Sequence, residues 1–184
     1  MKRLRSALLV VLFCVAPIGT GEAEDYAVAT ETASVRFTCP EGWHAIEDDR
    51  IDAFNTRQKE SNRFTGGIAH GENDLPDSWT LLQIKGLTPP SDLDTIRKTT
   101  PKVQDLASLG AVFADGSWKK SPTYYVEKYD VFVMLTCTDD TKSLMVKRFT
   151  PGGYVLFHFY TNGNNAQWFA DADLVLSSLW IGAG

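Results

Sequence analysis

The sequence is poor in the residues that usually build catalytic or metal centres. Its 184 residues include only three cysteines and three histidines. No two of these six residues are spaced as in a zinc-binding motif. Cys-x-x-Cys, Gly-x-Ser-x-Gly and the glycine-rich phosphate loop are also missing. These absences argue against a redox dithiol, an α/β-hydrolase nucleophile and a nucleotide phosphate site, so we expect no cofactor.

The sequence also lacks a basic cluster in its body and any long apolar run. The formal net charge is −5, and an acidic chain is a poor partner for nucleic acid. The apolar run at residues 7–15 is too short to cross about 30 Å of hydrocarbon. We therefore expect no nucleic-acid partner and no transmembrane anchor.

The N-terminus has the pattern of a secretory signal. Basic residues come first, then the apolar run, and then the small residues Gly21 and Ala23 at the positions that a signal peptidase reads. The pattern predicts a signal peptide over residues 1–23 and one mature domain over residues 24–184. The expected location is periplasmic or secreted. The basic residues are Lys2, Arg3 and Arg5.

Alternating apolar residues predict several strands in the remaining chain. Residues 34–39 and 79–87 each read as a strand, and residues 124–138 read as one long strand. Two further strands, 143–150 and 154–160, flank a turn at Pro151-Gly152-Gly153. The last of them is apolar on both sides, which is typical of a strand covered on both faces.

The stretches between these strands are less regular. Asn165 is expected to cap a helix whose apolar stripe contains Trp168, Ala172 and Val175. Residues 25–32 are expected to form a loose lead-in, and residues 70–78 a polar loop. The sum is an α+β fold with an antiparallel sheet of about five or six strands and helices on both faces.

Two segments resemble a known superfamily. Residues 35–43, Val-Arg-Phe-Thr-Cys-Pro-Glu-Gly-Trp, resemble the strand and Pro-x-Gly-Trp opening of PsbP-like and DcrB-like domains, and residues 169–179 resemble their closing helix. The resemblance implies an α/β/α sandwich and a mostly non-catalytic protein of the cell envelope, an adaptor or a stabilising subunit. It implies no catalytic residue. Pro40, Gly42 and Trp43 would form a turn and an aromatic plug for the core.

Aromatic residues offer one candidate binding surface. Four aromatic residues lie on or just before the predicted long strand: Trp118, Tyr124, Tyr125 and Tyr129. Tyrosine and tryptophan are enriched at protein interfaces, so these four residues are either a contact face or part of the core.

Histidines and acids offer a second candidate. His70, Glu72 and Asp74 form either an exposed site for a hard cation or a solvated acidic loop. His158 lies on a predicted strand, where it is either a packed histidine or a base. An envelope hydrolase would need these scattered residues to converge in one cleft.

Cys39 and Cys137 remain after the leader. In an oxidising compartment they either form one disulfide or stay as two buried thiols. A bridge would close a long loop and stabilise the fold by about 4–5 kcal/mol.

The sequence thus favours an exported, non-enzymatic accessory or binding protein of the bacterial cell envelope, with an envelope protein as its partner. Two alternatives stay open. One is the hydrolase, and the other is a carrier with aromatic residues lining a pocket of about 300 Å³ or more between sheet and helix.

Overall fold

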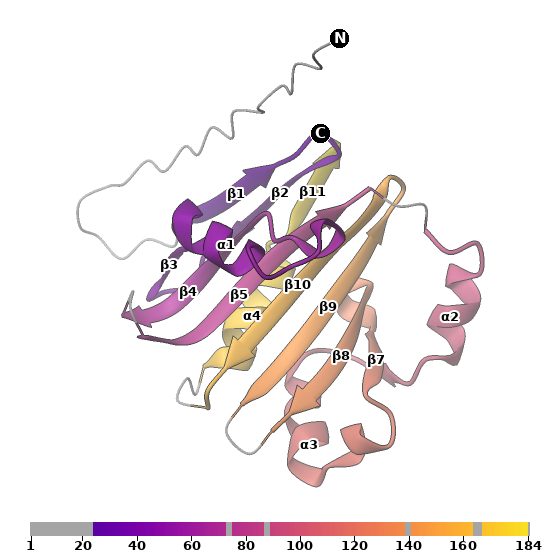
Figure 1. Ribbon diagram of the computed structural model, residues 1–184. Coiled ribbons are helices and arrows are strands. Elements are labelled where there is room, and N and C mark those ends of the chain that lie inside the picture. Colours follow the sequence, from indigo (N-terminus) through magenta and orange to yellow (C-terminus); the bar gives the residue numbers. More distant parts are fainter. Residues whose placement is uncertain (1–23, 73–74, 87–88, 139–140, 164–166, 184) are drawn as a thin grey trace.

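The computed structural model describes residues 24–72, 75–86, 89–138, 141–163 and 167–183 (Figure 1). An eight-stranded sheet runs through the described chain in the order β3-β4-β5-β10-β9-β8-β7-β6. Its pairs are antiparallel except for β6 and β7, which run parallel. The strands are β3 (Trp43–Ala45), β4 (Gly66–Glu72), β5 (Leu75–Lys85), β6 (Lys102–Val103), β7 (Thr123–Val126), β8 (Val131–Cys137), β9 (Lys142–Thr150) and β10 (Gly153–Thr161).

A second, three-stranded sheet and four α-helices complete the described architecture. The small sheet has the order β1-β2-β11, with β1 (Asp25–Ala29), β2 (Ala33–Thr38) and β11 (Trp180–Ala183). The helices are α1 (Asp48–Asn55), α2 (Leu93–Thr99), α3 (Ala107–Asp115) and α4 (Trp168–Ser177), with short 3-10 turns η1 (Glu60–Asn62), η2 (Ser117–Lys119) and η3 (Glu127–Tyr129). The α+β class is as predicted, but the main sheet is larger than the five or six strands expected.

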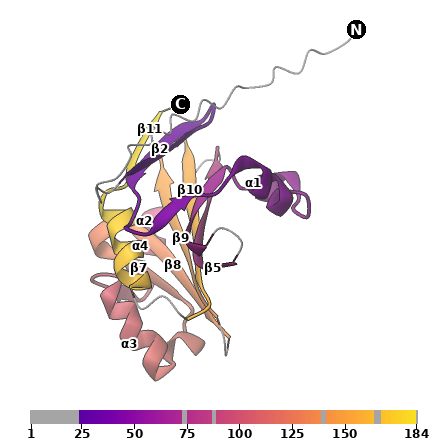
Figure 2. The same cartoon turned by 90° about the vertical axis from the view of Figure 1, so that its left-hand side faces the viewer.

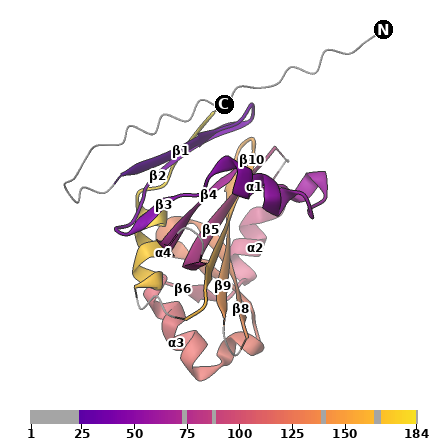
Figure 3. The same ribbon diagram turned by 60° about the vertical axis from the view of Figure 1, so that its left-hand side comes forward.

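The two faces of the large sheet are covered unequally. Figures 2 and 3 show β1, β2, β11, α3 and α4 on one side of the sheet and α1 on the other. No helix of the described residues is long and apolar enough to cross a membrane.

The main core lies between the large sheet and the layer formed by the small sheet, α3 and α4. Val155, Phe157 and Phe159 alternate along β10 and point into it, each at most 1% exposed. Phe37 of β2 meets Phe157 edge-on, with ring centroids 5.8 Å apart. Burying an aromatic or aliphatic side chain of this size contributes about 1.5–3 kcal/mol, so these contacts join the two sheets.

The predicted long strand at residues 124–138 is instead a hairpin of β7 and β8. The chain reverses through η3 and Asp130, whose φ of 52° lies in the left-handed region. Aspartate tolerates this conformation better than most residues. The Asp130 carboxylate accepts hydrogen bonds from Arg97 at 2.8 and 2.9 Å and from the Tyr125 hydroxyl at 2.8 Å. These bonds hold the turn in place.

Two other expectations about local structure are wrong. Residues 25–32 are not a loose lead-in, because β1 pairs with β2 over five residues. Residues 70–78 are mostly strand, since His70 pairs with Ser78 across β4 and β5. By contrast, the β9–β10 hairpin and α4 form where the sequence predicts them. The predicted cap Asn165 lies outside the described residues.

Candidate partner-binding face

The large sheet leaves much of one face without a helix over it. Residues on this outer face alternate with the core residues along β5, β7, β8, β9 and β10, as the strand registers require. In Figure 1 this face is turned to the viewer, and no helix crosses in front of β8, β9 and β10. The outer-face residues are Trp79, Leu81, Gln83, Lys85, Thr123, Tyr125, Phe132, Met134, Thr136, Ser143, Met145, Lys147, Phe149, Tyr154, Leu156, His158 and Tyr160.

A row of aromatic rings crosses four neighbouring strands of the outer face. Tyr125 lies 5.2 Å from Phe132, Phe132 lies 5.9 Å from Phe149, and Phe149 lies 5.9 Å from Tyr154, measured between ring centroids. Their planes are tilted by 46°, 79° and 67° from one ring to the next. Edge-to-face contacts of this kind stabilise one another, so the row is preformed. Phe132 is 9% exposed, and the other three rings are half-buried.

The charge on the outer face has one sign. None of its residues is a carboxylate, although the protein as a whole has a net charge of −5. Lys147 lies with its Nζ 4.6 Å from the Tyr154 ring centroid and 5.7 Å from that of Phe149. Within the described chain Lys147 has no ion-pair partner. This ammonium group therefore remains available to an acidic partner.

Other polar groups of the outer face are engaged or neutral. Lys85 donates to the backbone carbonyl of Ser61, and burial lowers its pKa. Burial also lowers the pKa of His158, whose ring meets Phe64 edge-on at 5.4 Å. His158 Nε2 is buried and has no hydrogen-bond partner among the described residues. His158 is thus held as a neutral, packed side chain.

The structure does not gather the four aromatic residues singled out in the sequence. Tyr125 belongs to the outer face, whereas Tyr124 and Tyr129 lie in the main core, each 8% exposed. Trp118 packs against the same core beside Phe113. The predicted long strand placed these residues together, and the hairpin at η3 separates them.

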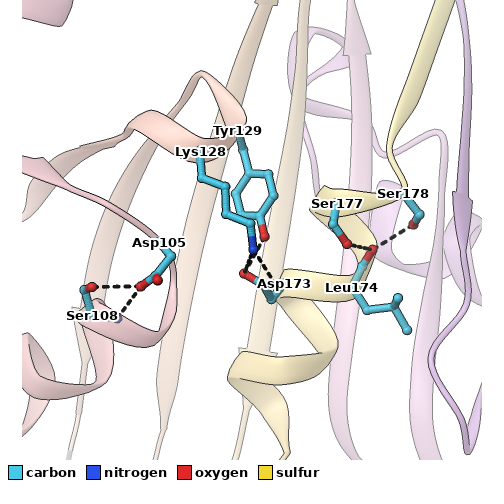
Figure 4. A network of polar contacts seen from close by, with 8 residues as sticks. All are labelled: Asp105, Ser108, Lys128, Tyr129, Asp173, Leu174, Ser177 and Ser178. Carbon is cyan, nitrogen blue, oxygen red and sulfur yellow. Dashed lines mark hydrogen bonds and ion pairs between the residues drawn. The ribbon is translucent and has the colours of Figure 1, made fainter.

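Tyr129 has a structural partner on α4. Its hydroxyl donates to Asp173, and Lys128 reaches the same carboxylate at 3.1 Å (Figure 4). Burial and the hydrogen bond to Asp173 raise the pKa of Tyr129. Figure 4 also shows Ser177 and Ser178 directed at the carbonyl of Leu174, one turn back on the same helix. These contacts tie the β7–β8 hairpin to α4 and close that helix.

The predicted cation site is only partly described. His70 Nδ1 lies 2.8 Å from Asp77 Oδ1, so its partner is an aspartate of β5. Asp74 and the side chain of Glu72 lie outside the described residues. Across the described residues no three His, Cys, Asp or Glu side chains are placed to hold a metal ion.

His70 and His158 lie on opposite faces of the sheet. His70 pairs with Ser78, and His158 pairs with Leu81. Residues 78 and 81 are separated by an odd number of positions on one strand, and successive strand residues point to opposite faces. A cleft that used both imidazoles as catalytic groups would have to pass through the sheet.

Both cysteines are free thiols. Cys39 is buried in the main core, where burial, with Glu24 and Asp171 nearby, raises its pKa to about 12. Cys137 is half-buried at the end of β8. The bridge between them, one of the two readings of the sequence, is not present.

The Pro-Glu-Gly-Trp segment forms a tight turn between β2 and β3. The Trp43 N–H donates to the Pro40 carbonyl at 3.1 Å, and Gly42 has a φ of 78° that suits glycine. Trp43 is buried, and its Nε1 donates to Asp171 of α4 at 2.9 Å. The turn thereby attaches the edge of the large sheet to α4.

These features define an α+β protein with two sheets and an aromatic sheet face that α1 covers only in part. No protein-family model and no curated protein match the sequence. Its fold is similar to that of cyanobacterial PsbP (CyanoP) from Synechocystis sp. PCC 6803, known from a solution structure. That alignment covers 93% of this chain and 99% of the other, with 14% sequence identity and a TM-score of 0.42.

Sequence reasoning missed most of the outer-face row. Phe132, Phe149 and Tyr154 look like ordinary strand residues until the register of β7 to β10 aligns them. The available signal was that β8 and β10 are apolar on both sides. For β10 that pattern predicted cover on both faces, and in the structure its second side is mostly half-buried, with Leu156 8% exposed and the neighbouring Met134 of β8 37% exposed.

Proposed function

We propose that this protein is an exported, non-enzymatic accessory or binding protein of the bacterial cell envelope, and that it binds its partner through the outer face. The support is the aromatic row of Tyr125, Phe132, Phe149 and Tyr154, capped by Lys147 on a part of the sheet that no helix covers. The few residues that dominate the binding energy of protein interfaces are enriched in tryptophan, tyrosine and arginine. The leader at residues 1–23 supports the envelope location.

The expected partner is a protein surface that presents carboxylates. The rings of the row are tilted against one another, and Lys147 covers Phe149 and Tyr154. Flat ring faces, which sugars need for stacking, are therefore not free. An acidic protein surface instead gains a charge pair with Lys147 and apolar contact with the ring edges.

The proposal is favoured over the hydrolase because His70 and His158 lie on opposite faces of the sheet. Both have structural roles, with His70 bonded to Asp77 and His158 packed on Phe64. The carrier alternative is not favoured either, because the pocket beside α1 has a volume of about 250 Å³, below the roughly 300 Å³ expected of a carrier.

Site-specific photo-crosslinking tests the proposed face. A photoreactive residue replaces Met134, which lies on the outer face and is 37% exposed. The matched control replaces Leu174, which is 38% exposed on α4, on the other side of the sheet. We expect a discrete adduct in the envelope fraction from position 134 and none from position 174. Mass spectrometry should identify an acidic stretch in the crosslinked partner.

A charge reversal decides whether Lys147 takes part. Lys147→Glu should reduce the adduct by about tenfold, because a close charge pair changes from attractive to repulsive. Lys142→Glu makes the same change on the same strand and should leave the adduct intact. Equal adducts from positions 134 and 174, a basic crosslinked stretch, or no effect of Lys147→Glu would each refute the proposed surface.

A further inference from the structure

A pocket of about 250 Å³ lies beside α1, apart from the aromatic row. One side of it is formed by α1 and the other by Tyr26 of β1 and the segment that leads into β4. The pocket is lined from α1 by four residues at the helical spacing i, i+3, i+4 and i+7, which are Asp48, Ile51, Asp52 and Asn55. Residues at this spacing share one helix face, so α1 turns both polar and apolar groups to the pocket.

Hydrogen bonds hold the pocket walls in place. The Asn55 side chain donates to the Phe64 carbonyl at 2.9 Å and accepts from the Phe64 N–H at 2.7 Å. The Tyr26 hydroxyl accepts from the Gly67 N–H at 2.8 Å. Gly66 lines the pocket between them. Because the walls are bonded to one another, a ligand would not have to order them.

The pocket lining combines apolar surface with negative charge. Ile46, Ile51 and Phe64 supply the apolar part, and Asp48 and Asp52 supply two carboxylates. Both aspartates are exposed to solvent at the rim of the pocket, and neither forms an ion pair with any residue that the structure describes. Asp48 also lies in the first turn of α1, where a negative charge stabilises the helix. Asp52 lies a turn further on and is also exposed to solvent.

We infer that the α1 pocket binds a small organic cation, an ammonium group carried on a compact apolar body. The carboxylates of Asp48 and Asp52 would pair with the ammonium group, and Phe64, Tyr26 and Ile51 would enclose the apolar part. The volume lies between that of a cavity for benzene, about 150 Å³, and that of a typical drug site, about 300–1,000 Å³. A free amine and a lysine side chain of another protein share this chemistry.

Titration with matched probes tests the site. Benzylamine is the cationic probe, benzyl alcohol is its neutral counterpart, and Nα-acetyl-lysine amide represents a protein side chain. The amide resonances of Gly66 and Gly67 report binding by NMR, since Gly66 lines the pocket and the Gly67 N–H is bonded to Tyr26, which also lines it. We expect benzylamine to shift them saturably at millimolar concentration, and benzyl alcohol to bind about tenfold more weakly or not at all.

A second test removes the charges of the two aspartates. Asp48→Asn combined with Asp52→Asn should weaken benzylamine at least about tenfold. Asp49→Asn is the control, because it removes an acid from the same helix that does not line the pocket. Circular dichroism checks that the variants stay folded. Lys147→Glu on the outer face should leave the titration unchanged, so this inference and the proposed function fail separately.

The results of these titrations distinguish a free amine from a lysine side chain as the ligand, and they show whether the positive charge matters at all. Saturation by benzylamine alone supports a free amine as the ligand, and saturation by Nα-acetyl-lysine amide as well supports a lysine of another protein. Equal binding of benzyl alcohol would overturn the inference, because the pocket would then be merely apolar. Unsaturated shifts at roughly 50 mM benzylamine, or an equal loss in Asp49→Asn, would overturn it too.

Discussion

The Tyr26 hydroxyl occupies the space that a side chain at position 66 would need. A Cβ added to Gly66 would overlap with Tyr26 Oη. The same hydroxyl accepts a 2.8 Å hydrogen bond from the next residue, Gly67. A single tyrosine of β1 therefore attaches the small sheet to the start of β4 and completes the wall of the α1 pocket.

This contact predicts a strong and specific effect of Gly66→Ala. The added methyl group must push Tyr26 aside, so the free energy of unfolding should fall by about 1–3 kcal/mol, as in other overpacked sites. Gly152→Ala is the control, because nothing lies within 4 Å of its added Cβ. Urea unfolding followed by fluorescence measures both variants.

A double-mutant cycle identifies the cause. Tyr26→Phe removes the overlapping oxygen and leaves the nearest ring carbon at an ordinary 3.4 Å from the added Cβ. On its own it should cost about 1 kcal/mol for the hydrogen bond. Gly66→Ala should then be less harmful in the Tyr26→Phe background than in the natural chain. Additive losses would show that Tyr26 is not what the methyl group meets.

The two cysteines should differ sharply in reactivity. A pKa of about 12 keeps Cys39 as the unreactive thiol at pH 8, since only the thiolate attacks. The native protein treated with iodoacetamide should therefore be alkylated at the half-buried Cys137 and not at Cys39. Peptide mass spectrometry reads the result.

Denaturation completes the cysteine experiment. Alkylation in urea without a reductant should modify both residues, because both are free thiols. A Cys137→Ser variant should give no native labelling, which serves as the control. Protection of both residues until a reductant is added would mean that they are joined in the protein isolated from its compartment.

The strands with a clear pattern were predictable from the sequence. Alternation and the Pro151-Gly152-Gly153 turn placed β9 and β10 correctly, and the Trp168 stripe placed α4. The β7–β8 turn was not, because Val126 and Val131 continue the apolar pattern on each side of η3. The reversal between β7 and β8 depends on Asp130, which has a left-handed backbone conformation. Its carboxylate accepts a hydrogen bond from Arg97 of α2, 33 residues earlier in the chain.

The candidate site was harder to predict than the fold, for a physical reason. A sheet face is defined by the register between strands, which a single sequence does not show. Tyr125 was found because it lies in an aromatic-rich segment. Phe149 and Tyr154 join it only through the pairing of β8, β9 and β10. The α1 pocket likewise needs Tyr26 of β1, a strand that the small, polar lead-in concealed.

His158 makes stability depend on pH in a defined direction. Burial lowers its pKa in the folded protein, while an unfolded chain has the ordinary value of about 6.5. Between the folded-state pKa and that value the unfolded state binds a proton at His158 and the folded state does not, so protonation favours unfolding. The stabilising contribution is complete above about pH 6.5 and is lost as the pH falls toward the folded-state pKa.

His158→Phe should therefore lose less stability than the natural protein between pH 7.5 and pH 5.5. Phenylalanine keeps the edge-on contact with Phe64 and removes both the titrating group and the buried, unpartnered Nε2. Urea denaturation at the two pH values gives the free energies of unfolding.

Tyr160→Phe, on the same face of the same strand, controls for a change of ring without a change of titration. His44, whose pKa is also lowered by burial, keeps its contribution in every variant. An equal pH-dependent loss in His158→Phe and the natural protein would show that His158 titrates normally and is open to water.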